Sequence, residues 1–169
     1  PFEYRPSLFV SDFSGDRVLR FSAIDGTLWE DEFVKEGSGG LSRPWGLGYG
    51  PDKNLFVAST STSSVLRFNG TTGAFLSKFC SVPGEPKAIN FHYRDLFVSS
   101  MFGEAILRYN GLSGSPQGKY IHNIERPAGL AFDTLNFHPL TNTATTQISP
   151  GGLQTFLRYS RHEPTIIEL

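Results

Sequence analysis

Residues 44–75 read PWGLGYGPDKNLFVASTSTSSVLRFNGTTGAF, and this stretch decides the fold. It holds three short apolar motifs separated by turn residues: a run that begins at Pro44, the triplet Leu55-Phe56-Val57, and the run Val65-Leu66-Arg67-Phe68. Glycine, proline, asparagine and serine fill the gaps between them, as they do between short strands.

The same motifs return along the chain in the same order. The Leu-Phe-Val triplet begins at Leu8, Leu55 and Leu96, so its copies start 47 and then 41 residues apart. The arginine motif begins at Val18, Val65, Ile106 and Phe156, and the proline motif at Pro44, Pro86 and Pro127. A period of this length indicates a repeat architecture.

Each motif has the pattern of a strand. Leu-Phe-Val is typical of a strand buried on both faces, whereas Val-Leu-Arg-Phe alternates, so that Leu66 and Phe68 point one way and Arg67 the other. A fourth strand can follow a glycine turn, over residues 27–33, 74–79 and 117–121. Four short antiparallel strands in just over forty residues make the blade of a β-propeller. A sandwich of unrelated hairpins would not repeat three motifs in register.

We therefore predict an all-β chain forming a single β-propeller domain over 1–169, with repeats at about 7–43, 44–85, 86–126 and 127–169. The last repeat is degenerate, because the Leu-Phe-Val triplet is missing after Phe132. About four blades are present. The chain either closes as a four-bladed ring, is an incomplete part of a larger propeller, or is completed by a partner, and we expect an incomplete or atypical propeller.

Composition excludes several classes of function. The net charge is −1 and no basic block is present, which argues against nucleic-acid binding. No apolar run reaches the roughly 18 residues that membrane insertion requires. The single cysteine, Cys80, forms no internal disulfide and is expected to be a small core residue.

Residues 44–75 also resemble the NHL-type repeats of extracellular and cell-surface bacterial proteins and, more loosely, the virginiamycin-lyase-like and gluconolactonase-like propellers. The resemblance covers about residues 7–132. It implies five or six blades, and it favours an extracellular, periplasmic or organelle-lumen location. The histidine and metal chemistry of those enzymes does not match this chain residue by residue, so no cofactor is expected.

Propellers bind partners where the loops of all blades converge. The best candidates flank the proline motif, and Arg43, Glu85 and Arg126 occupy equivalent places in three repeats. Arg43 and Arg126 would recognise an acidic or carboxylate-bearing partner, with Trp45 as aromatic anchor and Lys87 beside it. The alternative is a rim in which these residues only pair with one another.

Other polar residues have competing interpretations. Arg20, Arg67, Arg108 and Arg158 would form a basic ring for phosphate or sulfate, but pairing with carboxylates or aromatic rings is the better account. Asp12 and Asp16 are a weak calcium candidate, and an Asx-type turn explains them better. Asn69-Gly70-Thr71 fits a glycosylation acceptor and also a turn. His92 is a weak catalytic candidate.

Two functions remain. The preferred one is a non-catalytic protein–protein interaction scaffold, a subunit or accessory module of a larger assembly whose partners are other protein subunits. It predicts exposed aromatic side chains, with Phe13, Phe102 and Trp29 as candidates. The alternative is a lyase- or lactonase-like enzyme that acts on a small molecule at the channel mouth and depends on His92 or on an acidic set.

Overall fold

The computed structural model describes residues 6–132, 144–149, 152–161 and 163–167. The chain divides into two compact units, residues 1–132 and residues 133–169, and each is described by itself. Side chains are described for residues 6–132 only. Within the described residues no helix is long and apolar enough to cross a membrane.

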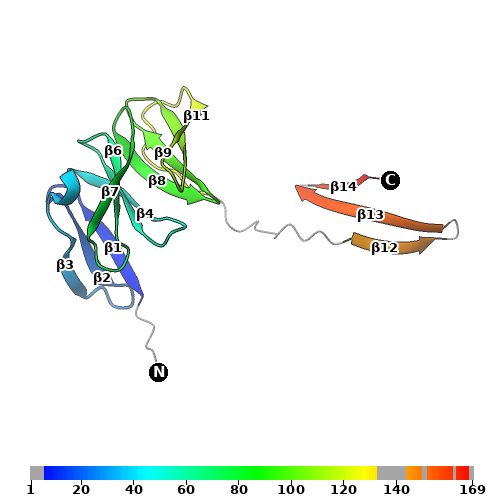
Figure 1. The fold of residues 1–169 in the computed structure, drawn as a ribbon, viewed down its shortest axis with the longest axis horizontal. Coiled ribbons are helices and arrows are strands. Elements are labelled where there is room, and N and C mark those ends of the chain that lie inside the picture. Colours follow the sequence, from blue (N-terminus) through cyan, green and yellow to red (C-terminus); the bar gives the residue numbers. More distant parts are fainter. Residues whose placement is uncertain (1–5, 133–143, 150–151, 162, 168–169) are drawn as a thin grey trace. The chain divides into compact units, whose positions relative to one another are not determined.

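The first unit consists of three antiparallel sheets (Figure 1). The first sheet has three strands, in the order β1 (Ser7–Asp12), β2 (Arg17–Ser22), β3 (Leu28–Val34). The second has four: β4 (Pro44–Tyr49), β5 (Leu55–Ser59), β6 (Ser64–Phe68), β7 (Phe75–Ser81). The third repeats this order with β8 (Pro86–His92), β9 (Asp95–Ser100), β10 (Ala105–Asn110), β11 (Pro116–His122). The predicted four-stranded blade is therefore confirmed.

The second unit is one antiparallel sheet of three strands: β12 (Ala144–Ser149), β13 (Gly152–Arg161) and β14 (Glu163–Ile167). The fourth copy of the arginine motif lies within β13, as its pattern predicts. The side chain of Arg158 is outside the described part, and so is the segment 133–143.

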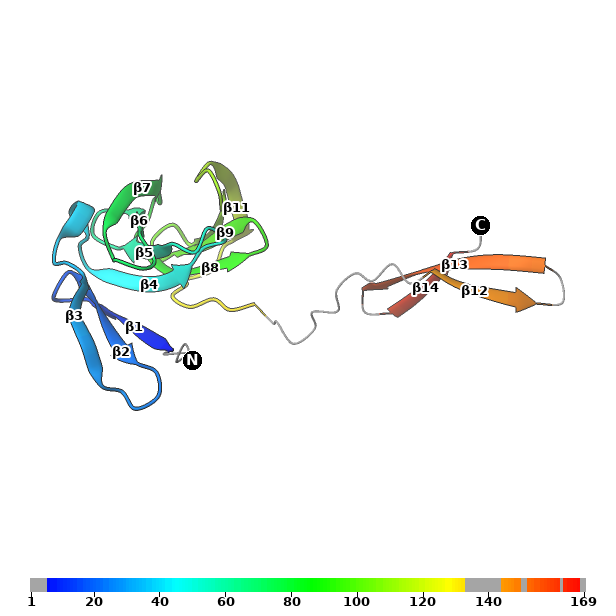
Figure 2. The same ribbon diagram turned by 60° about the horizontal axis from the view of Figure 1, so that its bottom comes forward.

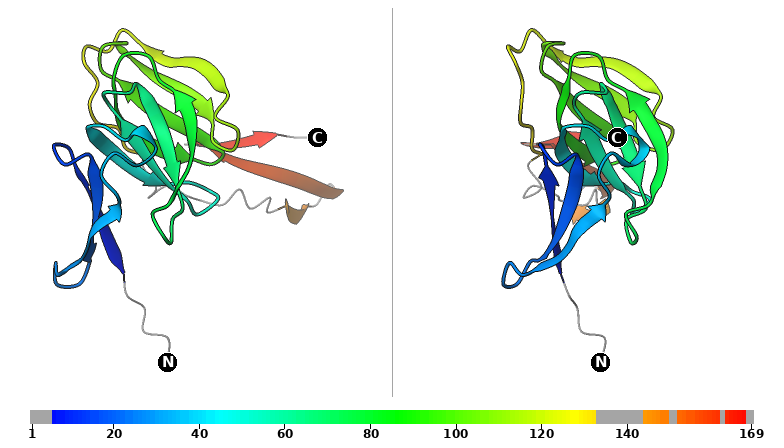
Figure 3. Two further views of the ribbon diagram at one scale, coloured as in Figure 1. Left: turned by 60° about the vertical axis from the view of Figure 1, so that its left-hand side comes forward. Right: turned by 90° about the vertical axis from the view of Figure 1, so that its left-hand side faces the viewer.

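The Leu-Phe-Val strands are the buried centre of the second and third sheets. Every residue of β5 is buried, and so is every residue of β9 except Asp95. The strand β5 is buried on both faces because the first sheet lies on one side of it and the third sheet on the other. In β9, Leu96 and Val98 face the second sheet, and Phe97 packs against Tyr120 and Phe132 on the other face. Figures 2 and 3 show the three sheets fanned around the innermost strands β4 and β8, which lie side by side.

Two apolar clusters join the sheets. The cluster between the first and second sheets has eight buried members, Val18, Phe33, Val34, Leu41, Leu55, Val57, Leu66 and Phe68. The cluster between the second and third sheets includes Phe56, Val65, Cys80, Leu96, Val98 and Leu107. Leu66 and Phe68 therefore face the preceding sheet, as the alternation predicts.

A trio of aromatic rings recurs in each of the three sheets of the first unit. The Phe of the Leu-Phe-Val triplet contacts an aromatic ring on the outermost strand of its own sheet and another at the end of the next proline motif. Centroid distances are 4.7 Å for Phe9–Phe33 and 5.6 Å for Phe9–Tyr49. The equivalent contacts are Phe56–Phe79 (4.8 Å), Phe56–Phe91 (4.8 Å), Phe97–Tyr120 (4.9 Å) and Phe97–Phe132 (5.0 Å).

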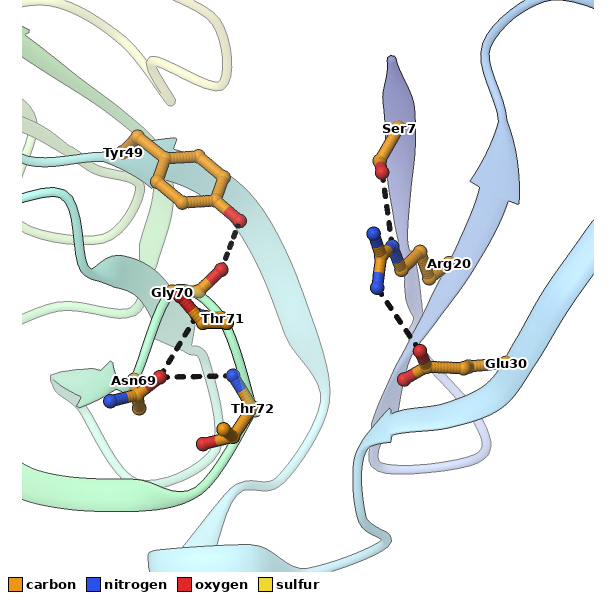
Figure 4. Close-up of polar contacts among 8 residues, drawn as sticks. All are labelled: Ser7, Arg20, Glu30, Tyr49, Asn69, Gly70, Thr71 and Thr72. Carbon is orange, nitrogen blue, oxygen red and sulfur yellow. Dashed lines mark hydrogen bonds and ion pairs between the residues drawn. The ribbon is translucent and has the colours of Figure 1, made fainter. Parts of the chain in front are cut away.

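The arginine of each blade covers this trio. Arg20 lies 5.9 Å from the centre of the Phe9 ring, and its guanidinium donates hydrogen bonds to Ser7 Oγ at 3.0 Å and Glu30 Oε1 at 3.1 Å (Figure 4). Arg67 lies over Phe56 and pairs with Asp52, and Arg108 lies over Phe97 and pairs with Asp95. Arg67 was expected to stay out of the joints between blades. It lies at the edge of one, because its guanidinium lies over Phe56, a member of the cluster between the second and third sheets.

The turn between the third and fourth strands is also repeated. Asn69 Oδ1 accepts hydrogen bonds from the backbone N–H groups of Thr71 and Thr72, both at 2.9 Å (Figure 4). Asn110 does the same for Leu112 and Ser113, at 3.0 and 2.9 Å. The side chain of Asn69 thus holds a turn, as expected. The glycine with positive φ in this turn is Gly73 (φ 69°) rather than Gly70.

The third proline motif departs from the prediction. Residues 127–132 form no strand, although Pro127 is buried like Pro44 and Phe132 packs on Phe97. A strand requires a partner for its backbone groups. The segment 127–132 lies where an innermost strand would be, but in the described part of the chain it pairs with no strand.

We predict that Leu66→Ala lowers the free energy of unfolding by about 2–5 kcal/mol, because Leu66 is 2% exposed and its loss leaves a cavity between two sheets. Leu76→Ala is the matched control. Leu76 is 45% exposed on the neighbouring strand, so its truncation should cost about 0.5 kcal/mol or less. Urea denaturation of both variants measures the difference, and equal losses would contradict the assigned face.

Candidate functional site

The residues that precede the proline motifs share an uncommon backbone conformation. Arg43, Glu85 and Arg126 have φ values of 49°, 56° and 46°, in the left-handed region that non-glycine residues seldom occupy. Arg43 N donates to Asp16 Oδ1 at 2.6 Å, and Arg43 O accepts from Thr60 N at 3.3 Å. Glu85 O accepts in the same way from Met101 N at 3.1 Å. These bonds fix the starts of β4 and β8, so Arg43 and Glu85 lie at the same end of their blades.

Four of the five predicted binding residues lie in one cluster, which we call the mouth cluster. It consists of Arg43, Trp45, Glu85, Lys87 and the additional residue Phe13. The Arg43 guanidinium lies 5.7 Å from the centre of the Phe13 ring, and Phe13 meets Trp45 edge-on at 5.5 Å. Lys87 Nζ lies 4.4 Å from the centre of the Trp45 ring and 3.3 Å from Glu85 Oε2.

The mouth cluster combines a buried charge with an exposed ring. The side chain of Lys87 is 8% exposed, and Glu85 and the face of Trp45 take the place of its water. Trp45 is 46% exposed and Phe13 is 37% exposed. The cluster therefore presents a fixed aromatic surface bordered by cations.

Arg126 lies apart from the mouth cluster. Its guanidinium lies 5.7 Å from the centre of the Phe102 ring, and Phe102 is 56% exposed. The pair repeats the Arg43–Phe13 contact two repeats further along the chain. Phe13 and Phe102 were predicted only as exposed aromatics, because they are shifted by one position relative to the repeat and no motif links them to an arginine.

The arginine motif does not form a basic ring in the described part of the chain. Arg20, Arg67 and Arg108 each pair with a carboxylate and lie over an aromatic ring. The interpretation as structural ion pairs is confirmed for these three. Partial exposure of the side chains limits the contribution of each pair to stability.

Asp12 and Asp16 have structural partners. Asp12 Oδ1 accepts from Gly15 N at 3.0 Å, and Asp12 Oδ2 accepts from Arg17 Nε at 2.9 Å. The hydrogen bond from Arg17 lowers the pKa of the Asp12 carboxyl. The turn around Asp12 is the expected Asx type. Among the described residues no group of three His, Cys, Asp or Glu side chains could hold a metal ion.

His92 is the last residue of β8, whereas Glu85 and Lys87 lie at its start. Its ring stacks on Phe132 with centroids 4.3 Å apart and an angle of 16°. A strand rises about 3.3 Å per residue, so His92 and the mouth cluster lie at opposite ends of the blade. A site that depends on His92 would be separate from the mouth cluster.

Cys80 lies in the cluster between the second and third sheets and is 7% exposed. Burial raises the pKa of its thiol to about 12. A nucleophilic cysteine needs a lowered pKa and access to solvent. Its expected role as a small core residue is therefore confirmed.

Comparison with known proteins identifies the fold. No protein-family model and no curated protein matches the chain. Similar solved structures include a gluconolactonase from Xanthomonas campestris, with TM-score 0.55, 23% identity, and coverage of 70% of this chain and 38% of that one. Virginiamycin B lyase from Staphylococcus aureus has a TM-score of 0.56 and 22% identity, and the match covers 75% of this chain and 42% of that one. A chain of the nidogen/laminin complex has a TM-score of 0.60 and 16% identity, and the match covers 95% of this chain and 55% of that one.

These proteins are β-propellers, and the chain has the β-propeller fold with four-stranded antiparallel blades. At these identities the likeness shows the fold alone, because one propeller scaffold supports many functions. The chain spans about half or less of the length of these three structures.

We predict that alkaline pH destabilises the fold through Cys80 and Tyr109. Burial raises both pKa values in the folded state, and the Tyr109 hydroxyl donates to Ser81 O at 2.9 Å. The unfolded thiol ionises near pH 9, so stability is complete below about pH 8 and falls between about pH 9 and 12. Urea denaturation at several pH values measures this fall. It should be smaller in Cys80→Ala, and identical falls would contradict the assignment.

Proposed function

We propose that this chain is a non-catalytic protein-binding scaffold of NHL-type repeats, a module of a larger assembly, and that the mouth cluster binds an acidic segment of a partner protein. The observation that carries the proposal is the exposed Trp45 ring, held edge-on by Phe13 and covered on one side by Lys87. A ring fixed in this way loses little conformational entropy on binding.

The residue types are those that dominate binding energy at protein interfaces. Tryptophan and arginine are enriched among the residues whose loss weakens binding most. The guanidinium of Arg43 lies over the Phe13 ring, 5.7 Å from its centre, and a guanidinium over a ring keeps its N–H donors for other partners. Those donors match a carboxylate, whereas Lys87 is already neutralised by Glu85.

The proposed partner is a protein subunit with an acidic segment that carries an apolar side chain. The apolar side chain would cover the exposed part of Trp45 and Phe13 while a carboxylate pairs with Arg43. The resemblance to NHL-type repeats supports an extracellular, periplasmic or lumenal setting. The nidogen/laminin structure supports protein binding by a propeller of similar fold.

We predict that the chain binds fluorescein-labelled peptides in which glutamate alternates with leucine, more tightly than matched peptides with glutamine in place of glutamate. Trp45→Ala should weaken this binding by about tenfold or more, and Arg43→Ala should weaken it and reduce its dependence on salt. Fluorescence anisotropy measures the dissociation constants.

The control is Tyr93→Ala. Tyr93 is also an exposed aromatic residue, at 73%, but it lies beside His92 at the other end of β8. Binding should be unchanged in this variant. Equal losses in Trp45→Ala and Tyr93→Ala, or equal binding of the glutamine peptides, would overturn the proposal.

A further inference from the structure

The turn that follows the arginine motif is built in the same way in all three sheets of the first unit. The backbone N–H of its first residue donates to the carbonyl oxygen five residues later: Ser22 to Thr27 at 2.8 Å, Asn69 to Ala74 at 2.8 Å, and Asn110 to Ser115 at 2.9 Å. The side-chain oxygen of the first residue also accepts backbone hydrogen bonds. Ser22 Oγ accepts from Ile24 N at 3.2 Å and from Asp25 N at 3.4 Å, as the amide oxygens of the two asparagines accept from the equivalent groups. Ser22 shows that the turn requires an oxygen at this position and no amide nitrogen.

The amide nitrogen of Asn69 is therefore not used by the turn. Two backbone N–H groups at 2.9 Å point at one end of the amide, which identifies that end as the oxygen. In the described part of the chain Nδ2 makes no hydrogen bond, and it is not among the buried polar atoms that lack a partner. It is therefore open to solvent, and Figure 4 shows it directed away from Thr71 and Thr72.

The hydroxyl of Thr71 is not used by the turn either. Thr71 is exposed and contributes its backbone N–H, and its hydroxyl makes no hydrogen bond to any residue that the structure describes. The other two turns have Ile24 and Leu112 at this position. Asn69 and Thr71 nevertheless complete the Asn-x-Ser/Thr acceptor motif for N-glycosylation, which occurs once in the 169-residue sequence. The turn thus accounts for the backbone of the motif but for neither of the two side-chain groups that define it.

We propose that Asn69 carries an N-linked oligosaccharide. The transfer forms a bond between Nδ2 and C1 of the first sugar of a lipid-linked oligosaccharide. The bond from C1 to the phosphate of this donor breaks, the lipid diphosphate leaves with the bonding electrons, and Nδ2 gives up one proton to the transferase. Oδ1 takes no part, so both backbone hydrogen bonds of the turn are kept. The modification does not depend on the ligand of the mouth cluster. It requires passage through a secretory compartment, in keeping with the proposed extracellular or lumenal setting.

The modified turn lies at the end of the blade opposite the mouth cluster. The hydroxyl of Tyr49, the last residue of β4, donates to Gly70 O at 3.0 Å (Figure 4), whereas Trp45 is near the start of the same strand. Four residues of a strand span roughly 13 Å. The oligosaccharide is therefore attached away from Trp45 and leaves the mouth cluster free for a partner protein.

Secretion of the 169-residue chain from cultured animal cells, behind a cleavable signal peptide, tests the modification. We expect an intact mass above 18.7 kDa, and peptide-N-glycosidase treatment should leave aspartate at position 69 as the only change from the sequence. Thr71→Ala should abolish the added mass and Thr71→Ser should retain it. Neither variant changes a hydrogen bond of the turn, because Thr71 contributes only its backbone N–H. A secreted wild-type chain with a mass of 18.7 kDa would overturn the proposal.

The matched control uses the turn at Asn110, whose amide oxygen accepts from Leu112 N at 3.0 Å and from Ser113 N at 2.9 Å. Leu112 is 56% exposed, so Leu112→Thr completes the motif in an equivalent turn and should add a second oligosaccharide. The melting temperature of the wild-type chain should be the same before and after glycosidase treatment, because Nδ2 of Asn69 is not used by the turn. A lower melting temperature of the glycosylated chain, or a single oligosaccharide in Leu112→Thr, would contradict the argument from the geometry of the turn.

Discussion

The contact on which the whole structure depends is the one between the Phe of each Leu-Phe-Val strand and the aromatic ring that ends the next proline motif. Phe9–Tyr49, Phe56–Phe91 and Phe97–Phe132 are successive copies of this contact. The first two contacts each join two sheets, and the third joins the third sheet to the segment 127–132. The stability of such an array is approximately a sum over blades and the joints between neighbours.

The joints also build the candidate site. Phe13 follows a strand of the first sheet, Trp45 belongs to the second, and Lys87 to the third. Their contacts therefore depend on how closely the innermost strands approach. Gly46 permits this approach, because a Cβ at that position would lie 2.4 Å from Lys87 O. The binding surface is thus a property of the array rather than of one blade.

The sequence was sufficient to predict the parts of the structure that repeat. The motifs located β4, β5 and β6 and their equivalents, and the alternation placed Leu66 and Phe68 together on one face, which the structure shows to be the face toward the preceding sheet. The aromatic trio was not predicted, because its members come from three strands and two sheets. The equivalence of Arg43, Glu85 and Arg126 was visible, but their shared left-handed conformation was not. The Arg43–Phe13 contact was missed, since it joins two loops. Whether 1–169 is a single domain, and whether the mouth cluster binds a partner, stay predictions.

A double-mutant cycle across one joint tests the account most directly. Phe56 and Phe91 are substituted by leucine singly and together, and the free energy of unfolding is measured by urea denaturation. Because the two rings contact each other at 4.8 Å between different sheets, the account predicts a coupling energy of about 0.5–1.5 kcal/mol. Effects that add to within about 0.3 kcal/mol would show that the joint does not depend on this contact.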